Sequence, residues 1–333
     1  MKIAIVKLSA LGDIIHTMFV LQFIKKYNHE ILIDWVVEES YKDLLNTHPD
    51  INKVHVVNFK KAKQKKSLYL FFNEIKNVQK FGNYDLVIDM QGLIKSALIS
   101  RLITSSITLG FDKKSAREGF ASIFYNQTFT YGYEKNIVER NLEMINFGLN
   151  LNIKKQDVLK KLPFLYSSKK HCNNNLSKLK KNVLLIPGAS NKSKRLPVSS
   201  FVKLSTQIDA NFIIIWGSLD EKILANEIKR SSLNINISHK LNLEELILLI
   251  GRVDLVIGPD TGPTHMAWAL NIPSITIYGP TPGYRNSYTT NINRVIESDS
   301  IVNPFRINHN DYSLKDLNIS DIVETANNLL LSE

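Results

Sequence analysis

Several segments of the sequence place charged side chains directly after short apolar runs, where they could do chemistry. The first is Lys7–Asp13 (KLSALGD), which follows Ile3–Val6. A carboxylate such as Asp13 could remove a proton from a substrate hydroxyl, or it could cap the helix that follows. The segment lacks the GxGxxG pattern, which disfavours a dinucleotide-dependent dehydrogenase.

The second segment, Pro187–Arg195 (PGASNKSKR), follows the apolar run Val183–Ile186. A glycine loop with Lys192, Lys194 and Arg195 would suit an anion such as a pyrophosphate. The same charges would also suit a solvated loop, so this segment alone is not specific.

The third segment is Gly258–His265 (GPDTGPTH), between an apolar run and a helical pattern. Pro263 suits a first helical turn, which leaves the backbone N–H groups of that turn available to phosphate oxygens. Asp260 adds an acceptor for sugar hydroxyls. The alternative is a turn aspartate with a half-buried histidine, but the density of polar groups at Asp260–His265 favours a binding site.

Two further features are less specific. Glu221 follows the pair Trp216-Gly217 and could accept hydrogen bonds from a ribose or, equally, complement a helix dipole. Six lysines fall within 14 residues that contain no Asp or Glu: Lys53, Lys60, Lys61, Lys63, Lys65 and Lys66. With the aromatic residues nearby, this lysine run could contact anionic head groups, or it could be a solvated loop.

Composition limits the function classes. The chain has 333 residues, 44% of them hydrophobic, and a net charge of +11, which indicates a globular protein with room for two domains and an anionic partner. No recognition motif for nucleic acid is present, so we expect no nucleic-acid partner. The single cysteine, Cys172, excludes an intrachain disulfide. Without a signal peptide pattern or an apolar run of about 20 residues, we expect a cytoplasmic protein.

Apolar runs alternate with helical patterns in both halves of the chain, which is typical of parallel sheets with helices on both faces. We expect a first Rossmann-like domain at 1–165, a linker at 166–181, a second such domain at 182–315 and a final helix at 316–333. The expected strands are Ile3–Val6, Ile31–Val37, Val54–Val57, Leu86–Ile88, Ile107–Leu109, Val183–Ile186, Phe212–Trp216, Ile235–Ile237, Leu255–Ile257 and Ile275–Tyr278. In such α/β domains ligands bind at the carboxyl ends of the strands, so we expect the site in a cleft between the domains.

At this level of detail the chain resembles the ADP-heptose:lipopolysaccharide heptosyltransferases. The matching segments are Lys7–His16 (KLSALGDIIH), Val87–Ser96 (VIDMQGLIKS), Ala116–Asn126 (AREGFASIFYN), Asp260–His265 (DTGPTH) and Tyr278–Thr281 (YGPT). The segment Ala116–Asn126 is closer to the first heptosyltransferase than to the second. The resemblance implies the GT-B fold, with two doubly wound domains facing across a cleft.

It also implies an inverting transfer of L-glycero-D-manno-heptose from ADP-heptose to the Kdo residue of Kdo-lipid A, on the cytoplasmic face of an anionic inner membrane. The N-terminal domain would bind the acceptor and the C-terminal domain the donor, and the last helix would cross back to the first domain. No metal ion and no cofactor are implied. The alternatives are a transferase of the same fold with another sugar or acceptor, and a non-catalytic binding protein.

The family's functional residues match particular positions of this sequence. Asp13 matches the general base and Lys194 the phosphate-binding lysine. Expected donor contacts are Ala189, Ser190, Lys194, Glu221, Leu241, Asp260, Thr261, Gly262 and His265, and expected acceptor contacts are Lys7, Lys60, Lys61, Lys63 and Arg117. The sequence departs from the family where threonines are replaced by Ala189 and Ser190, a methionine by Leu241, and acceptor-side arginines largely by lysines.

Overall fold

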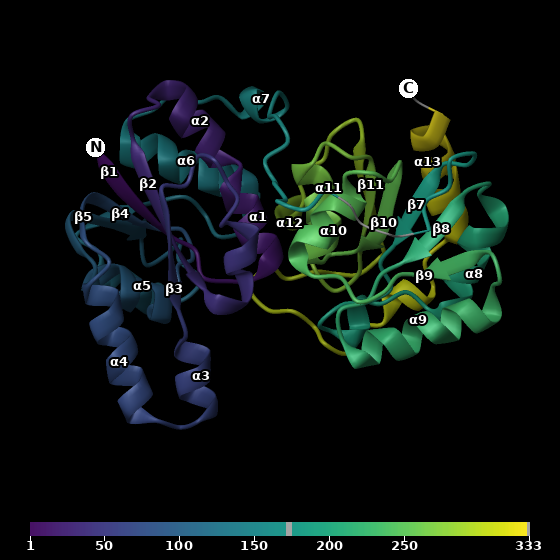
Figure 1. Cartoon of the computed structure of the whole chain (residues 1–333), viewed down its shortest axis with the longest axis horizontal. Helices are drawn as coiled ribbons and strands as arrows, with labels where there is room; N and C mark the ends of the chain where they lie inside the picture. The colour runs from purple at the N-terminus through teal and green to yellow at the C-terminus, as the bar shows by residue number, and fades with distance from the viewer. Residues whose placement is uncertain (171–174, 332–333) are drawn as a thin grey trace. The chain divides into compact units, whose positions relative to one another are not determined.

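The computed structural model describes residues 1–170 and 175–331, which form two compact units (Figure 1). The first runs from Met1 to Phe164 and the second begins at Leu165. Each unit is built on a six-stranded sheet in which all paired strands are parallel. Both units therefore have the doubly wound α/β architecture that the sequence predicts.

The sheet of the first unit has the strand order β3-β2-β1-β4-β5-β6. Its strands are β1 Lys2–Val6, β2 Leu32–Glu38, β3 Lys53–Val57, β4 Asn83–Asp89, β5 Thr104–Phe111 and β6 Gln127–Phe129. Its helices are α1 Leu11–Met18, α2 Val20–Tyr27, α3 Phe59–Gln64, α4 Leu68–Gln79, α5 Ile94–Leu102, α6 Ile137–Leu149 and α7 Lys155–Val158, with 3₁₀ turns η1 Glu39–Leu44 and η2 Gly119–Phe124.

The second sheet repeats this topology with the order β12-β11-β10-β7-β8-β9. Its strands are β7 Asn182–Leu185, β8 Asn211–Ile214, β9 Ile235–Ile237, β10 Leu255–Pro259, β11 Ser274–Tyr278 and β12 Asn293–Glu297. Its helices are α8 Val198–Gln207, α9 Leu219–Ser231, α10 Leu243–Ile250, α11 Gly262–Ala269, α12 Gly283–Asn286 and α13 Ile319–Leu331, with 3₁₀ turns η3 Lys192–Lys194 and η4 Ser313–Lys315.

The strand order fixes where a ligand site can form. In each unit the chain leaves the first strand in one direction across the sheet and the fourth strand in the other, so the loops after these two strands diverge, and doubly wound domains bind ligands between such loops. The two strands are β1 and β4 in the first unit, and β7 and β10 in the second. The three charged segments that the sequence analysis singled out follow β1, β7 and β10, and the family motif Val87–Ser96 spans the end of β4, so all four lie at these two switch points.

Burial explains why the strands are apolar throughout. Helices cover both faces of a parallel sheet, so alternate residues on a strand cannot face water. In β1 the residues Ile3–Val6 are fully buried, and so is every residue of Val183–Leu185 in β7. Most predicted strands accordingly agree with the structure to within a few residues.

The last helix is a correction to the expected domain organisation. Helix α13 packs on the second unit and was expected to cross back to the first. Its residues Ile322, Ala326 and Leu329 are buried in one cluster with Phe201 of α8 and Ile275 of β11. The physical reason is the apolar stripe at positions i, i+4 and i+7, which the faces of α8 and the second sheet cover.

The predicted linker also differs from the structure. Of residues 166–181, the described ones belong to the second unit, where Ser168 donates to Glu244 and Lys169 pairs with Glu245 at 2.6 Å. These two acidic residues lie in the first turn of α10. Positions 171–174 of the predicted linker lie outside the described residues.

Helices α3 and α4 form a hairpin that extends away from the sheet of the first unit (Figure 1). Only Val78 of α4 is buried, whereas Leu68, Tyr69 and Phe72 are more than half exposed. Among the described residues, no helix combines the length and the apolar character needed to cross a membrane.

Candidate functional site

A buried carboxylate organises the switch point of the second unit. Asp260 directly follows β10, and its side chain is 10% exposed. Its Oδ2 accepts a hydrogen bond from Nζ of Lys194 at 2.7 Å, and its Oδ1 lies 3.0 Å from Nε2 of His265. Lys194 comes from the loop after β7, the strand beside β10, so the sheet order brings the two charges together.

Two residues that the sequence analysis did not assign complete this cluster. The hydroxyl of Thr281 donates to Oδ2 of Asp260 at 3.0 Å, and the amide of Asn286 does so at 3.4 Å. Both follow β11, the other neighbour of β10. The segment Tyr278–Thr281 carried part of the family resemblance, so Thr281 had a sequence signal, but Asn286 had none.

The cluster holds Asp260 ionised. Burial alone would raise the pKa of this carboxyl group, but the hydrogen bond from His265 and the charge of Lys194 outweigh it and hold the pKa well below its usual range. Nearby, burial and then the Asp260 charge raise the pKa of Tyr278 well above its ordinary value. The site thus combines a fixed negative charge with the ammonium group of Lys194, which has three donors and spends one on Asp260.

Local hydrogen bonds shape the loops that carry these side chains. Asn191 caps the 3₁₀ turn that ends at Lys194, and Arg195 donates twice to the carbonyl of Ala189, which closes the loop. Within this closed loop Ala189 is buried, whereas Ser190 is exposed. In α11, Thr264 donates to the carbonyl of Pro259 and ties the helix start to β10.

The first turn of α11 has the geometry expected for anion binding. Thr261 is its N-cap residue, Gly262 begins the helix and Pro263 lies in the first turn. The side chain of Thr261 makes no capping hydrogen bond, so the backbone N–H groups of this turn suit an anion at the positive end of the helix. His265, on the same helix, is 5% exposed and faces Asp260.

Glu221 lies on the other side of β7, at the start of α9. Its Oε2 accepts from the N–H groups of Gly217 and Ser218, so it caps the start of α9. Its Oε1 makes no hydrogen bond to any residue in 1–170 or 175–331 and lies against Gly188, where an added Cβ would approach it to 2.4 Å. Glu221 can therefore cap the helix with Oε2 and still contact a ligand with Oε1. Leu241 is half-buried in the loop after β9.

At the switch point of the first unit, Asp13 lies in the first turn of α1 and is half-buried. Its Oδ2 accepts from the N–H of Ala10 at 3.2 Å, whereas Oδ1 makes no hydrogen bond within the described parts of the chain. Burial, followed by the charges of Glu38 and Asp13, raises the pKa of the nearby Tyr41. Asp13 thus caps its helix with one oxygen, and the described residues leave the other oxygen without a hydrogen bond.

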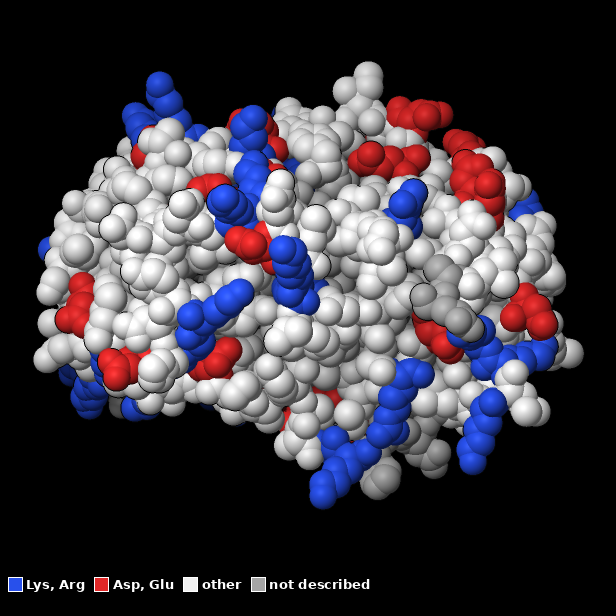
Figure 2. Space-filling view, turned by 90° about the horizontal axis from the view of Figure 1, so that it is seen from above, with Lys and Arg blue, Asp and Glu red and all other residues white. Residues whose placement is uncertain are grey.

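The expected acceptor contacts differ in their exposure. Lys7 is 3% exposed and donates to the carbonyl of Met90 at 2.8 Å, so it ties the end of β1 to the segment after β4, and its acceptor role stays a prediction. Arg117 and Lys61 are exposed. Lys60 and Lys63 lie on α3, but their side chains are outside the described set. On the face drawn in Figure 2, basic side chains are scattered rather than gathered in one large patch.

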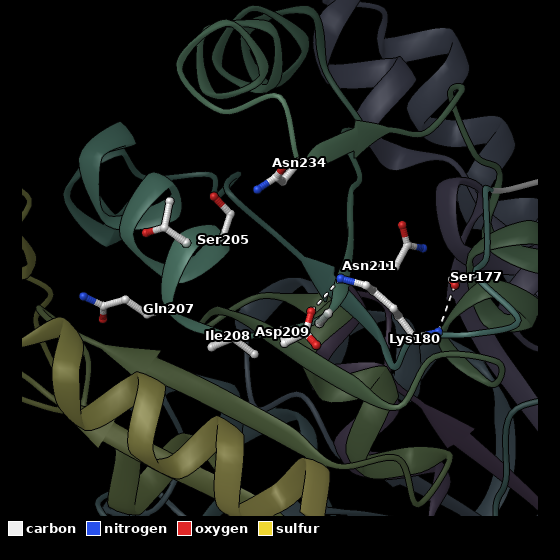
Figure 3. Close-up of a pocket in the computed structure, with 10 residues that line it drawn as sticks. Ser177, Lys180, Ser205, Gln207, Ile208, Asp209, Asn211 and Asn234 are labelled. Carbon is white, nitrogen blue, oxygen red and sulfur yellow. Dashed lines mark hydrogen bonds and ion pairs between the residues drawn. The ribbon is translucent and has the colours of Figure 1, made fainter.

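A separate pocket of about 490 Å³ lies at the amino ends of the strands of the second sheet, whereas the Asp260 cluster lies at their carboxyl ends (Figure 3). It is lined by polar residues near the starts of β7 and β8, and Lys180 pairs there with Asp209 at 2.6 Å. None of the residues predicted from the sequence lines it. Among the described residues, no group of three or more His, Cys, Asp or Glu side chains forms a potential metal site.

Comparison with known proteins identifies a matching family and full-length relatives. Residues 75–303 match the family described as glycosyltransferase family 9 (heptosyltransferase). The chain is 40% identical to lipopolysaccharide heptosyltransferase 1 of Campylobacter coli over all of both chains. It is 28% identical to lipopolysaccharide heptosyltransferase 1 of Escherichia coli K12, over 87% of this chain and 92% of that one.

Solved structures show the same fold. The heptosyltransferase WaaC of Escherichia coli with ADP has a TM-score of 0.80 and 24% identity, covering 99% of this chain and 100% of that one. The same enzyme with ADP-2-deoxy-2-fluoro heptose has a TM-score of 0.78 and 24% identity, covering 98% and 99% of the two chains.

The geometry predicts that Asp260 stabilises the second unit. Asp260→Asn would leave the ammonium group of Lys194 without its carboxylate, at a cost of about 3 kcal/mol at pH 7. Since the folded-state pKa of Asp260 is lowered, its contribution is complete above the unfolded pKa of about 3.9 and is lost as pH falls below it. The difference in the free energy of unfolding between the wild type and Asp260→Asn should therefore become smaller as the pH falls from 5 to 3.

Denaturant unfolding followed by tryptophan fluorescence measures this, since Trp216 and Trp268 lie in the second unit. Asp209→Asn is the matched control, because Asp209 also pairs with a lysine but is 86% exposed. Equal effects of the two substitutions would contradict the assigned role of Asp260.

Proposed function

Because the chain belongs to glycosyltransferase family 9, the heptosyltransferases, we propose that it transfers L-glycero-D-manno-heptose from ADP-heptose to the Kdo residue of Kdo-lipid A, with inversion. The full-length similarity to heptosyltransferase 1 of Campylobacter coli supports the choice of donor and acceptor. The observation that carries the proposal is the Asp260–Lys194–His265 cluster beside the N-terminus of α11, which suits a sugar diphosphate.

The second unit would bind the donor. Among the described residues Lys194 donates to Asp260 alone, so its two other N–H donors would hold the diphosphate, together with the backbone N–H groups of Gly262 and Thr264. Charge grows on the diphosphate as the glycosidic bond breaks, so Lys194 would stabilise the transition state more than the ground state. Asp260 and His265 would contact the heptose, Oε1 of Glu221 the ribose, and Leu241 the adenine, with Ala189, Ser190 and Thr261 beside the phosphates.

The first unit would bind the acceptor and supply the base. A sugar hydroxyl is a poor nucleophile, and its proton must leave as the new bond forms. Oδ1 of Asp13 would take that proton while the hydroxyl attacks the anomeric carbon opposite the departing ADP. A single displacement of this kind inverts the anomeric centre without a covalent intermediate on the enzyme.

The hairpin α3–α4 would contact the membrane that carries the lipid acceptor. Leu68 and Tyr69 are each 74% exposed and Phe72 is 58% exposed, next to the exposed lysines Lys61 and Lys65. Aromatic and leucine side chains insert at the head-group level, and each lysine near an anionic surface adds about 1 kcal/mol. The chain would thus lie on the cytoplasmic face of the inner membrane without spanning it.

The direct test is incubation of the protein with ADP-heptose and Kdo-lipid A, followed by mass spectrometry of the lipid. We expect a mass increase of one heptose, dependent on the donor. A lipid of unchanged mass would contradict the proposed function, and transfer from a UDP-sugar instead would support a different transferase of the same fold.

For the general base, we expect Asp13→Asn to slow transfer at least about 100-fold. The amide keeps the helix cap but cannot accept the proton, so folding and ADP affinity should remain at wild-type values. The exposed Asp43 of the same unit provides the control substitution Asp43→Asn, which should leave the rate unchanged. Near-normal turnover of folded Asp13→Asn would show that the carboxylate is only a helix cap.

For the membrane contact, we expect replacement of Lys61, Lys65 and Lys66 by serine to weaken binding to vesicles that contain anionic phosphatidylglycerol. The loss should be largest at low salt, because attraction between exposed charges is screened within roughly 8 Å at physiological ionic strength. Replacing the exposed Lys178, Lys203 and Lys240 changes the net charge equally and is the control. If both triple variants lost vesicle binding equally, net charge alone would explain the effect, and the hairpin would have no specific role.

A further inference from the structure

A second buried carboxylate lies at the end of β4 in the first unit. Asp89 is fully buried, and its two oxygens accept four hydrogen bonds. Oδ2 accepts from Ser96 and Tyr125, both at 2.8 Å, and Oδ1 accepts from the backbone N–H groups of Gln91 at 2.8 Å and Gly92 at 3.2 Å. Asp89 therefore fixes the turn that carries Gln91.

The side chain of Gln91 is bound entirely to the backbone after β1. Its Oε1 accepts from the N–H groups of Leu8 at 2.9 Å and Ser9 at 3.3 Å, and its Nε2 donates to the carbonyl of Ser9 at 2.6 Å. These three bonds extend the pairing of β1 and β4 beyond the strands, with an amide side chain in place of backbone. On the other side, the N–H of Glu38 donates to the carbonyl of Leu8 at 3.1 Å.

The backbone of Leu8 and Ser9, which Gln91 binds, is connected to Asp13 through the next residue, Ala10. Ala10 follows Ser9, and its N–H is the donor to Oδ2 of Asp13. A displacement of Ser9 would move Ala10, and with it the orientation of the Asp13 carboxylate. Errors of about 1 Å in the position of a catalytic group can cost a hundredfold in rate.

The turn after β4 also holds the Arg117 segment. Gly92 has φ +70°, and its carbonyl accepts from the N–H of Glu118 at 3.1 Å. The carboxylate of Glu118 in turn accepts from the N–H of Ile94 at 2.8 Å. One turn thus connects the Asp13 loop to the segment that would contact the acceptor.

We propose that Gln91, held by the buried carboxylate of Asp89, is a positioning residue that fixes the Leu8–Ala10 backbone and thereby the general base Asp13. The proposal rests on the proposed function, since it gives Asp13 the proton-accepting role. Gln91 itself does not touch the substrate: the effect of its removal passes through the backbone that it holds.

Kinetics of single and double variants test the chemical half of the proposal. Gln91→Ala should slow heptose transfer at least about 10-fold, with ADP affinity within twofold of wild type because the donor site lies in the second unit. In the Asp13→Asn background the same substitution should change the rate less than about twofold, since the group that Gln91 positions is already inactive. Equal slowing in both backgrounds, or no slowing in the wild-type background, overturns the proposal.

Hydrogen exchange tests the structural half independently of activity. In Gln91→Ala the amides of Leu8 and Ser9 should exchange faster than in wild type, because they lose their acceptor. Gln91→Glu retains the acceptor oxygen and should protect these amides more than alanine does, which keeps the test informative if alanine perturbs folding. Gln79→Ala, at an exposed glutamine of the same unit, is the control.

Unchanged exchange of the two amides in Gln91→Ala overturns the proposal even if the enzyme proves to use other substrates. Faster exchange together with a wild-type protein that transfers no heptose contradicts the proposed function instead, so the two failures are distinguishable.

Discussion

The arrangement of the second unit depends on one buried negative charge. Asp260 would be costly to bury alone, and it is stable only because Lys194, His265, Thr281 and Asn286 surround it. Lys194 comes from the loop after β7 and Thr281 from the loop after β11, whereas His265 lies on α11 and Asn286 on α12. The carboxylate therefore gathers side chains from three adjacent strands, and it directs the ammonium group of Lys194 without consuming all of its donors.

The first unit also buries a carboxylate at the equivalent place in its sheet, at the end of β4. There the buried carboxylate of Asp89 binds backbone N–H groups and two hydroxyls rather than a cation. Its effect is to fix two loops, after β1 and after β4, instead of a charged side chain. The same strand order thus supports two kinds of site: under the proposed function, one would present a positive charge to a diphosphate and the other would present a carboxylate to a hydroxyl.

Much of this could be predicted from the sequence, because parallel strands buried on both faces leave continuous apolar runs such as Ile3–Val6. Helix α6 and strand β12 were not predicted: α6 carries Arg140 and Asn141 on buried positions, and β12 is a short edge strand with only Asn293 buried. The sequence located residues such as Asp13 and Glu221, but their spacing could not show that each caps a helix with one oxygen while its other oxygen makes no hydrogen bond to the described residues. The burial of Lys7 and the contact of Asn286 with Asp260 depend on tertiary packing, which leaves no local pattern in the sequence.

The central claim is that Lys194, held by Asp260, stabilises the departing diphosphate in the transition state. It is tested most directly by comparing the turnover and ADP affinity of Lys194→Ala with those of Lys192→Ala, an exposed lysine of the same 3₁₀ turn. We predict that Lys194→Ala lowers kcat about 100-fold or more while calorimetry shows a much smaller loss of ADP affinity, and that Lys192→Ala changes neither. Equal losses of kcat and ADP affinity in Lys194→Ala, or matching behaviour of the two variants, would contradict the account.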